Sequence, residues 1–358
     1  MHNLSKTIFP VFVCLLLAAA CQPDITPTAV STPTTPLTLP EGFTAVPFIT
    51  DLSRPTQFIE GPDGRIWIAQ LFAGESDAQG QVIAIDPNTG EQSVLLAGLN
   101  KPTGIAVLDN ALWIAEESRL LRAALDDNLQ PQTLGVVLNE MPYNGRSNGT
   151  LTVSPDGLLI YETSGRRQGN RAAAGSGTLW ALDPAQLDSP TVLATGLKNA
   201  YAHVFDANGR LWITEIGDGS VTGADFEGQP PEELNLVIPG ADYGWPQCFG
   251  DQEPALNRDG TPEVCARTQP PAALFNPQST PTGIAISPWD EDVLLVARWL
   301  GQEVTAVAIH MENGRIVGET RPFIVGFGNP QHLLALPDQT LLVSDYREGV
   351  IYKVEQGQ

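Results

Sequence analysis

The chain has 358 residues, with 19 Lys and Arg against 41 Asp and Glu, which gives a formal net charge of −22. This charge repels phosphate backbones and anionic lipid headgroups, so it argues against nucleic-acid binding and against membrane docking through a basic patch. Acidity of this kind keeps an exported protein soluble. An acidic binding patch is the alternative interpretation.

Residues 1–20 have the features of an export signal. Lys6 is the only basic side chain before an apolar run at 7–20, TIFPVFVCLLLAAA, which is too short to span a bilayer. The run LLLAAAC resembles the lipobox of a bacterial lipoprotein signal, with Cys21 as the lipidated new N-terminus. An ordinary secretory signal is the alternative. We therefore expect an extracytoplasmic protein that is anchored to the bacterial cell envelope and contacts the membrane only through its lipid.

A Pro/Thr-rich stretch, QPDITPTAVSTPTTPLTLP, follows Cys21 and carries almost no charge. Such a composition predicts an extended tether at residues 21–40. The remaining residues, 41–358, are then the folded domain. We expect this domain to be a monomer.

One β-hairpin pattern occurs six times in residues 41–358. In each copy an apolar run enters a tight turn and leaves as a second apolar strand: TQFIEGPDGRIWIAQ, GIAVLDNALWIAE, LTVSPDGLLIYE, HVFDANGRLWIT, GIAISPWDEDVLLVA and LLALPDQTLLVS. The second strands begin near Ile66, Leu112, Leu159, Leu211, Leu294 and Leu341, at intervals of 46, 47, 52, 83 and 47 residues. A period in the forties built from β-hairpins is typical of propeller blades.

We therefore predict an all-β fold, a six-bladed β-propeller with a long insertion between its fourth and fifth blades. The continuous apolar strands suit sheets that are packed on both faces. The last unit ends with three strands, and a lone strand at residues 43–49 can pair with it to close the ring. An open sandwich is the alternative. We expect four tryptophans to pack between blades: Trp67, Trp113, Trp180 and Trp212.

Two cysteines, Cys248 and Cys265, remain in the mature domain once Cys14 leaves with the signal and Cys21 carries the lipid. Both lie in the insertion, 17 residues apart, and in an oxidising compartment this predicts a disulfide. A metal pair is the alternative, but no His or third Cys lies close in the sequence.

The insertion also carries a specific family resemblance. The segments GLKNAYAHVFDANGRLWITEIGDG, EELNLVIPGADYGWPQCFG and FNPQSTPTGIAIS resemble the glucose/sorbosone dehydrogenase family. The run from Pro239 to Cys248, PG-x-x-YGWP-x-C, is the most restricted match. The resemblance covers residues 39–358 and implies a six-bladed propeller that oxidises a sugar hydroxyl by hydride transfer to pyrroloquinoline quinone. It implies a His as the base and a Ca²⁺ that polarises the quinone.

The residues that would handle the proton depart from the family pattern. Alignment on Leu151 places Arg146 where the resemblance expects the catalytic base. A guanidinium stays protonated at physiological pH and only donates hydrogen bonds, so Arg146 cannot act as that base. The acidic partner expected about nineteen residues later falls on Gly165.

Several cofactor positions are kept in part. Lys198 and Asn199 stand where the family holds the quinone carboxylates with an Arg-Asn pair. Asn329 and His332 occupy the turn where two further arginines are expected, and Arg298 offers a replacement positive charge.

The resemblance also implies a calcium site and leaves sugar contacts to be assigned. Backbone carbonyls at Gly217 and Asp218 match the family's Ca²⁺ ligands. Trp245 and Trp299 lie in or beside loops and are candidates for substrate contact. A metal pair of His203 and His332 is disfavoured, because alignment of their repeats offsets them by one position and predicts opposite strand faces.

Acidic residues also end several second strands: Glu116, Glu117, Glu162, Glu215 and Asp345. Solvated charge is the simplest interpretation, but such carboxylates could gather a Ca²⁺ at the channel mouth. Three functions therefore stay open after the sequence alone. They are a quinone-dependent sugar dehydrogenase, a non-catalytic propeller that binds carbohydrate or protein, and a Ca²⁺-dependent lactone hydrolase of the gluconolactonase type.

Overall fold

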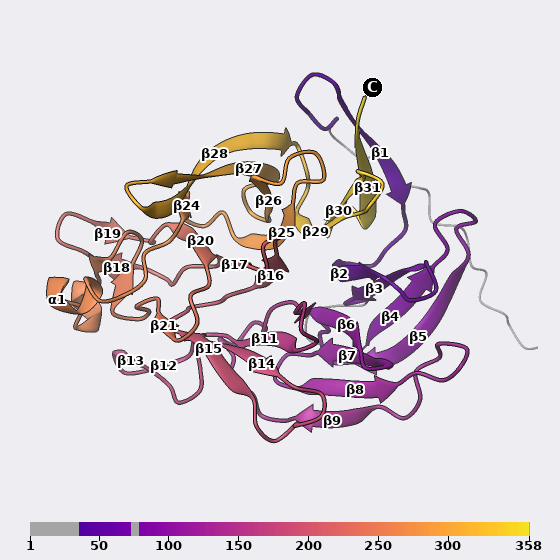
Figure 1. Cartoon of the computed structure of the whole chain (residues 1–358), viewed down its shortest axis with the longest axis horizontal. Helices are drawn as coiled ribbons and strands as arrows, with labels where there is room; N and C mark the ends of the chain where they lie inside the picture. Colours follow the sequence, from indigo (N-terminus) through magenta and orange to yellow (C-terminus); the bar gives the residue numbers. More distant parts are fainter. Residues whose placement is uncertain (1–35, 73–78, 358) are drawn as a thin grey trace, which may run out of the picture. The chain divides into compact units, whose positions relative to one another are not determined.

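A computed structural model describes residues 36–72 and 79–357 of the chain. Almost all regular secondary structure in the described part is β-strand. The main sheets are six antiparallel units of four strands, one of which carries a short fifth strand. The predicted six-bladed β-propeller is therefore confirmed (Figure 1). The predicted signal, Cys21 and most of the predicted tether lie outside the described residues.

The first three blades are built from consecutive hairpins. Blade 1 contains β2 (Pro55–Glu60), β3 (Ile66–Gln70), β4 (Gly80–Ile85) and β5 (Gln92–Leu99). Blade 2 contains β6 (Gly104–Leu108), β7 (Ala111–Ala115), β8 (Leu120–Ala124) and β9 (Gly135–Leu138). Blade 3 contains β10 (Thr152–Val153), β11 (Leu159–Thr163), β14 (Thr178–Leu182), β15 (Thr191–Thr195) and the parallel addition β21 (Ala241–Asp242).

The last three blades follow the same order from the channel outward. Blade 4 contains β16 (Ala202–Phe205), β17 (Leu211–Glu215), β20 (Glu232–Leu236) and β24 (Ala273–Phe275). Blade 5 contains β25 (Pro281–Ile286), β26 (Val293–Arg298), β27 (Glu303–Glu312) and β28 (Arg315–Val325). Blade 6 contains β29 (Pro330–Ala335), β30 (Leu341–Asp345), β31 (Val350–Gln356) and β1 (Phe43–Ile49).

Short strands and helices lie in the loops, mostly in the predicted insertion. They are β12 (Arg167–Gln168), β13 (Arg171–Ala172), β18 (Val221–Thr222), β19 (Glu227–Gly228), β22 (Cys248–Phe249), β23 (Glu253–Pro254), the 3₁₀ helix η1 (Leu256–Arg258) and α1 (Pro262–Cys265). Among the described residues, no helix is long and apolar enough to cross a membrane.

The two ends of the folded domain meet in blade 6. Strand β1 pairs with β31 in antiparallel register from Phe43 opposite Gln356 to Ile49 opposite Ile351. Figure 1 shows the two strands side by side, β1 in indigo and β31 in yellow. The predicted closure is therefore confirmed, and β31 has no open edge. Ordered contact begins slightly earlier than residue 41, because Thr38 exchanges backbone hydrogen bonds with Val325 at 2.9 and 3.0 Å.

Six apolar clusters hold neighbouring blades together, one at each interface, including the interface between blades 6 and 1. Trp67 packs between blades 1 and 2, Trp113 between blades 2 and 3, and Trp212 between blades 4 and 5. Trp180 is half-buried at the edge of the second interface, where its ring stacks on Tyr161 at 6.4 Å. The predicted packing of these tryptophans is confirmed.

A series of threonine hydroxyls also links the inner strands. Thr56 donates to the Pro102 carbonyl of blade 2 at 2.8 Å, and Thr103 donates to Gly149 at the start of blade 3 at 3.2 Å. Thr150 and Thr282 bond the following blades in the same way, at 3.2 and 3.3 Å. Because each hydroxyl satisfies a buried carbonyl, these bonds fix the spacing of the inner strands at the start of the channel.

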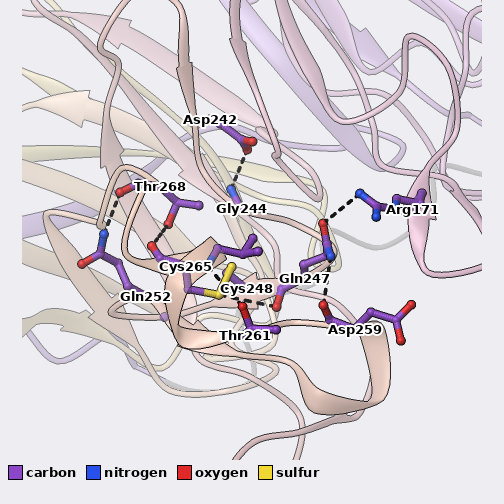
Figure 2. Close-up of a disulfide and its surroundings, with 12 residues drawn as sticks. Arg171, Asp242, Gly244, Gln247, Cys248, Gln252, Asp259, Thr261, Cys265 and Thr268 are labelled. Atoms are coloured by element: carbon purple, nitrogen blue, oxygen red, sulfur yellow. Dashed lines mark hydrogen bonds between the residues drawn. A yellow bond between two sulfur atoms is a disulfide. The ribbon is translucent and has the colours of Figure 1, made fainter.

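The predicted disulfide between Cys248 and Cys265 is confirmed, with an S–S distance of 1.99 Å (Figure 2). It joins β22 to α1, whose first turn is capped by Thr261 through a bond from the Val264 N–H at 3.3 Å. Gln247 adds a bond to the Asp259 carbonyl at 3.0 Å. The bridge therefore fixes the outer loop of the insertion, on which Trp245 depends for its position.

Candidate functional site

The inner strands of the blades begin at a cavity of about 510 Å³. Six of the residues predicted as base, cofactor, metal or substrate contacts line it: Arg146, Lys198, Asn199, Gly217, Asp218 and Trp299. Their loops come from blades 3, 4 and 5. The repeat therefore gathers residues that are up to 153 positions apart in the sequence at one mouth of the channel.

Lys198 lies on the wall of this cavity. Its ammonium donates to the Gly165 carbonyl at 3.2 Å and stands 5.7 Å from the centre of the Trp245 ring. Burial lowers the pKa of Lys198, while the negative charges of Asp218, Glu162 and Glu215 oppose that shift. Lys198 is thus a half-buried cation that Gly165 and Trp245 hold in place. An ammonium has three N–H donors, so it can also donate to an anionic ligand.

Asn199 has a different role from its neighbour. Its side-chain amide donates to Glu162 and accepts from the Asn144 amide at 3.4 Å. Burial raises the pKa of Glu162 to about 8, and hydrogen bonds together with the charge of Lys198 oppose the rise. Asn199 therefore joins the loops of blades 3 and 4, and most of its polar capacity is already used.

Arg146 lies in an exposed loop whose backbone is held by Asn144. The side-chain oxygen of Asn144 accepts from the backbone N–H groups of Arg146 and Ser147 at 2.9 and 3.3 Å, and the Asn144 backbone N–H donates to the Ser164 hydroxyl at 3.0 Å. No partner for the Arg146 guanidinium is found among the described residues. The loop therefore presents a guanidinium to the cavity at the position of the expected base.

Gly165 occupies the position of the expected acidic partner, and the structure explains why no side chain stands there. A Cβ at this position would lie 2.8 Å from the Lys198 carbonyl and 2.8 Å from the Trp245 ring. Trp245 is buried, lies outside the lining of the main cavity and donates to Asp218 at 3.0 Å. The predicted substrate contact thus fills the space of the missing carboxylate and supports Lys198.

Gly217 and Asp218 both reach the cavity wall. The Asp218 carboxylate accepts from Arg258 at 2.7 Å, and Arg258 is buried beside it. Burial would raise the pKa of Asp218, but bonds from Trp245 and Gly219 and the charge of Arg258 outweigh it and lower the pKa. Within the described ranges, no group of three or more His, Cys, Asp or Glu side chains is arranged to hold a metal ion.

Two predicted cofactor residues point elsewhere. Arg298 forms an ion pair with Glu303 and lies over the Phe275 ring at 5.8 Å, and it does not line the cavity. The Asn329 amide donates to the Trp299 carbonyl at 3.0 Å. Both side chains therefore stabilise the loops of blades 5 and 6 and leave cofactor contacts to other groups.

His332 lies in the channel beyond the cavity. It lines a second cavity of about 480 Å³, which the later residues of the inner strands form, and His203 lines the same cavity. Burial lowers the pKa of His203 to about 4 and that of His332 to about 3, so both rings are neutral. His332 packs edge-on against Phe58 of the following blade at 5.0 Å. His203 alternates with Val204, which packs towards the following blade, and so has the orientation of Phe205, which packs towards the preceding one. The two rings therefore lie on opposite strand faces, as predicted.

Two of the carboxylates at the strand ends, Glu116 and Asp345, anchor loops. Glu116 pairs with Arg119 and accepts from the Asn100 N–H at 2.6 Å. Asp345 accepts from four backbone N–H groups, those of Gly328, Asn329, Arg347 and Glu348. These two carboxylates are therefore already engaged within their own loops.

Comparisons with known proteins give one family match. Residues 111–324 match the sequence profile described as glucose/sorbosone dehydrogenase, which is more than half of the chain. The chain belongs to the glucose/sorbosone dehydrogenase family. A comparison with curated protein sequences gives no significant match.

Solved structures of two sugar dehydrogenases and of a carbohydrate-active enzyme share the fold of this glucose/sorbosone dehydrogenase family member at low identity. The PQQ domain of pyranose dehydrogenase from Coprinopsis cinerea, in its holo form, is 16% identical with a TM-score of 0.74, over 90% of this chain and 98% of that one. PQQ-bound aldose sugar dehydrogenase from Streptomyces coelicolor is 17% identical with a TM-score of 0.66, over 89% and 99%. The calcium structure of a family AA12 enzyme from Trichoderma reesei is 16% identical with a TM-score of 0.78, over 92% and 100%.

Sequence reasoning missed several cavity residues of this family member. Asn144 could have been found, because Asn is common in turns, where its side chain bonds the backbone two residues later. Tyr346 packs edge-on against Trp299 at 5.8 Å, and Glu232 accepts from the Gly217 N–H at 3.3 Å. Burial raises the pKa of Glu232 to about 7. Neither position stands out in the repeat, because Tyr346 lies in a turn and Glu232 is the first residue of β20.

Proposed function

We propose that this family member binds an anionic quinone, such as pyrroloquinoline quinone, in the main cavity and uses it to oxidise a sugar hydroxyl. The observation that carries the proposal is the cationic wall of a cavity of about 510 Å³, to which Lys101, Arg146 and Lys198 contribute. Two of the structural neighbours are named as PQQ-containing sugar dehydrogenases.

The residues present fit such a group. A quinone with several carboxylates needs positive charge and hydrogen-bond donors on one side, and Lys198 supplies both on a rigid support. Arg146 adds a guanidinium from the adjacent loop, in a chain that otherwise carries a large excess of negative charge. The quinone, when bound, accepts the hydride. The chain itself binds and orients both reactants.

Arg146 has a defined role in this proposal although it cannot be the base. Its guanidinium can donate to the oxygen of the substrate hydroxyl and stabilise negative charge that develops there. The proton then leaves to water in the open cavity. General bases typically contribute ~10²–10⁴-fold, so we expect turnover to be slow by about that factor relative to an enzyme with a base at this position.

The sugar is proposed to lie on the opposite wall of the cavity. Trp299 and Tyr346 form an edge-on aromatic pair there, and the Trp299 backbone is fixed by a bond to the Thr280 carbonyl at 2.8 Å. Aromatic faces of this kind offer a large rigid surface to the apolar face of a sugar ring. We also propose that backbone carbonyls at Gly217 and Asp218 hold a Ca²⁺ beside the quinone.

The test is direct. The purified mature chain is titrated with pyrroloquinoline quinone, with and without Ca²⁺, and binding is followed by calorimetry. The loaded protein is then mixed with aldoses and an electron acceptor, and bleaching of the acceptor is recorded. Saturable quinone binding with slow turnover supports the proposal. No binding at micromolar quinone contradicts it.

A non-catalytic propeller that binds carbohydrate is the second candidate. The observation that favours it is that Arg146 and Gly165 stand at the two proton-handling positions. Trp245 fills the space that an acidic side chain at position 165 would need. Arg146→His separates the two candidates, because it returns a base to the cavity. An increase of at least tenfold in turnover indicates a dehydrogenase that lacks only its base. If the variant still binds quinone but shows no turnover, the protein is a non-catalytic binding protein.

We further propose that the mature protein is anchored to the cell envelope through lipid on Cys21. The disulfide supports an oxidising, extracytoplasmic setting. Fractionation of cells that express the full chain should place it with the membranes. Cys21→Ser should release it to the soluble fraction if the lipid is its only anchor. Recovery of both forms in the soluble fraction would contradict the proposal.

A further inference from the structure

A separate depression adjoins the main cavity. It has a volume of about 540 Å³ and is lined by Arg54, Trp299, Asn329, Tyr346 and Arg347. Trp299 and Tyr346 line both spaces. A ligand that stacks on this aromatic pair in the main cavity can therefore extend past it towards the two arginines.

The two arginines come from neighbouring blades at the point where the ring closes. Arg54 immediately precedes β2 of blade 1, and its carbonyl accepts from the Leu71 N–H at 3.2 Å. Arg347 lies in the turn between β30 and β31 of blade 6, and its N–H donates to Asp345 at 3.0 Å. Their backbones are thus fixed, while their side chains are exposed to solvent.

Both guanidiniums lack a partner within the described ranges of the chain. Several other arginines are paired, for example Arg65 with Asp63 at 2.6 Å and Arg210 with Asp206 at 2.6 Å. In a chain with 41 acidic and 19 basic side chains, this depression brings two arginines without an acidic partner together. The Asp345 carboxylate, two residues before Arg347, is occupied by backbone N–H groups.

Arginine presents a planar fork of donors that matches the two oxygens of a carboxylate. A depression with two such forks, next to an aromatic wall, fits a sugar that carries a carboxylate. The lysine and arginine of the main cavity lie on the loops of blades 2, 3 and 4, whereas this depression is built from blades 1, 5 and 6. One rigid quinone need not contact both.

We propose that Arg54 and Arg347 form a subsite for the carboxylate of an acidic sugar, so that the substrate class is an oligosaccharide containing uronic acid. This inference rests on the proposed function for the identity of the reaction, but the binding it describes can be measured without turnover. The carboxylates of the quinone are the other possible source of the same chemistry, and the experiment separates the two.

The experiment measures binding by calorimetry to the mature chain, with and without pyrroloquinoline quinone. The probes are digalacturonic acid and its dimethyl ester, in which each carboxylate is replaced by a neutral methyl ester. The variants are Arg54→Gln and Arg347→Gln, with Arg321→Gln as a control that removes the same charge from an exposed position on β28. We expect the free acid to bind more tightly than the ester.

Each of the two variants should raise the dissociation constant of the acid at least about tenfold and leave that of the ester unchanged. Arg321→Gln should change neither. Equal affinity for acid and ester, or variants without effect on the acid, would overturn the subsite. A loss of quinone affinity in Arg54→Gln or Arg347→Gln would assign the arginines to the cofactor instead and overturn it too. Failure of the proposed function would show separately, as absent quinone binding in the unaltered chain.

Discussion

Glu233 offers the sharpest test of the electrostatics beneath the site. It stands on β20 directly opposite Glu215 of β17, and both carboxylates are buried. A single amide, that of Asn235, donates to Glu215 at 3.0 Å and to Glu233 at 3.2 Å, and the Gly250 N–H donates to Glu233 at 2.8 Å. Like charges at opposed positions of a sheet are destabilising. Replacing Glu233 with Gln removes one of them.

The expected size follows from the pKa. Burial raises the pKa of Glu233 from 4.5 to about 7, and hydrogen bonds from Asn235 and Gly250 oppose the rise. Such a rise corresponds to on the order of 3 kcal/mol of unfolding free energy. Because the folded pKa lies above the unfolded value, the stabilising contribution is complete below about pH 4.5. It is lost as the pH rises towards 7.

Glu233→Gln mimics the protonated form and should therefore be equal in stability to the unaltered chain at pH 4. At pH 8 it should be more stable, by roughly 1–3 kcal/mol or a few degrees in Tm. Thermal unfolding scans at fixed rate between pH 4 and pH 8 measure the difference. Glu319→Gln, at an exposed position, is the matched control. A variant that is less stable at pH 8, or a gap that does not depend on pH, would refute the reasoning.

Three further changes test other parts of the site. Lys198→Ala should weaken quinone binding about 10- to 100-fold in calorimetry, and binding to the unaltered chain should weaken with rising pH as the ammonium loses its proton; an unchanged affinity would remove Lys198 from the cofactor site. Gly165→Asp should lower stability by at least ~1–3 kcal/mol, because its Cβ would overlap Trp245; a Tm equal to the parent would show that the ring can move aside. Cys248→Ser paired with Cys265→Ser should cost about 3 kcal/mol in chemical unfolding by the chain-entropy argument, and a smaller loss would locate the stability of the insertion in its hydrogen bonds.

The fold could be predicted from the sequence because its signal is repeated. Each blade contains an apolar hairpin with a turn residue at a fixed place. A single hairpin pattern can arise by chance, but six copies at similar spacing cannot easily do so. Closure by residues 43–49 was predictable for a physical reason, since the last unit lacked one strand and an exposed edge is unfavourable. The threonine bonds at Thr56, Thr103, Thr150 and Thr282 were not predicted, because a hydroxyl partner depends on the neighbouring blade.

The site was predicted only in part, and the misses share one cause. Alignment with a family transfers a residue identity but not the direction of its side chain. Arg298 was available by position, yet Glu303 on the next strand pairs with it. Trp245 was expected to meet substrate, yet the space left by Gly165 buries it. His332 was a cofactor candidate by its place in the turn, yet it lines the second cavity and packs against Phe58 of blade 1.

The pairing of β1 with β31 has a consequence for how the molecule is made. Five blades can assemble while the chain is still growing. The sixth needs the first and the last strands together, so the contact with the largest sequence separation forms last. Until then the apolar flanks of blades 5 and 1 stay uncovered, which is the condition under which newly made chains aggregate. Loss of β31 (Val350–Gln356) should therefore prevent closure, because it would remove the strand that joins β1 to β30.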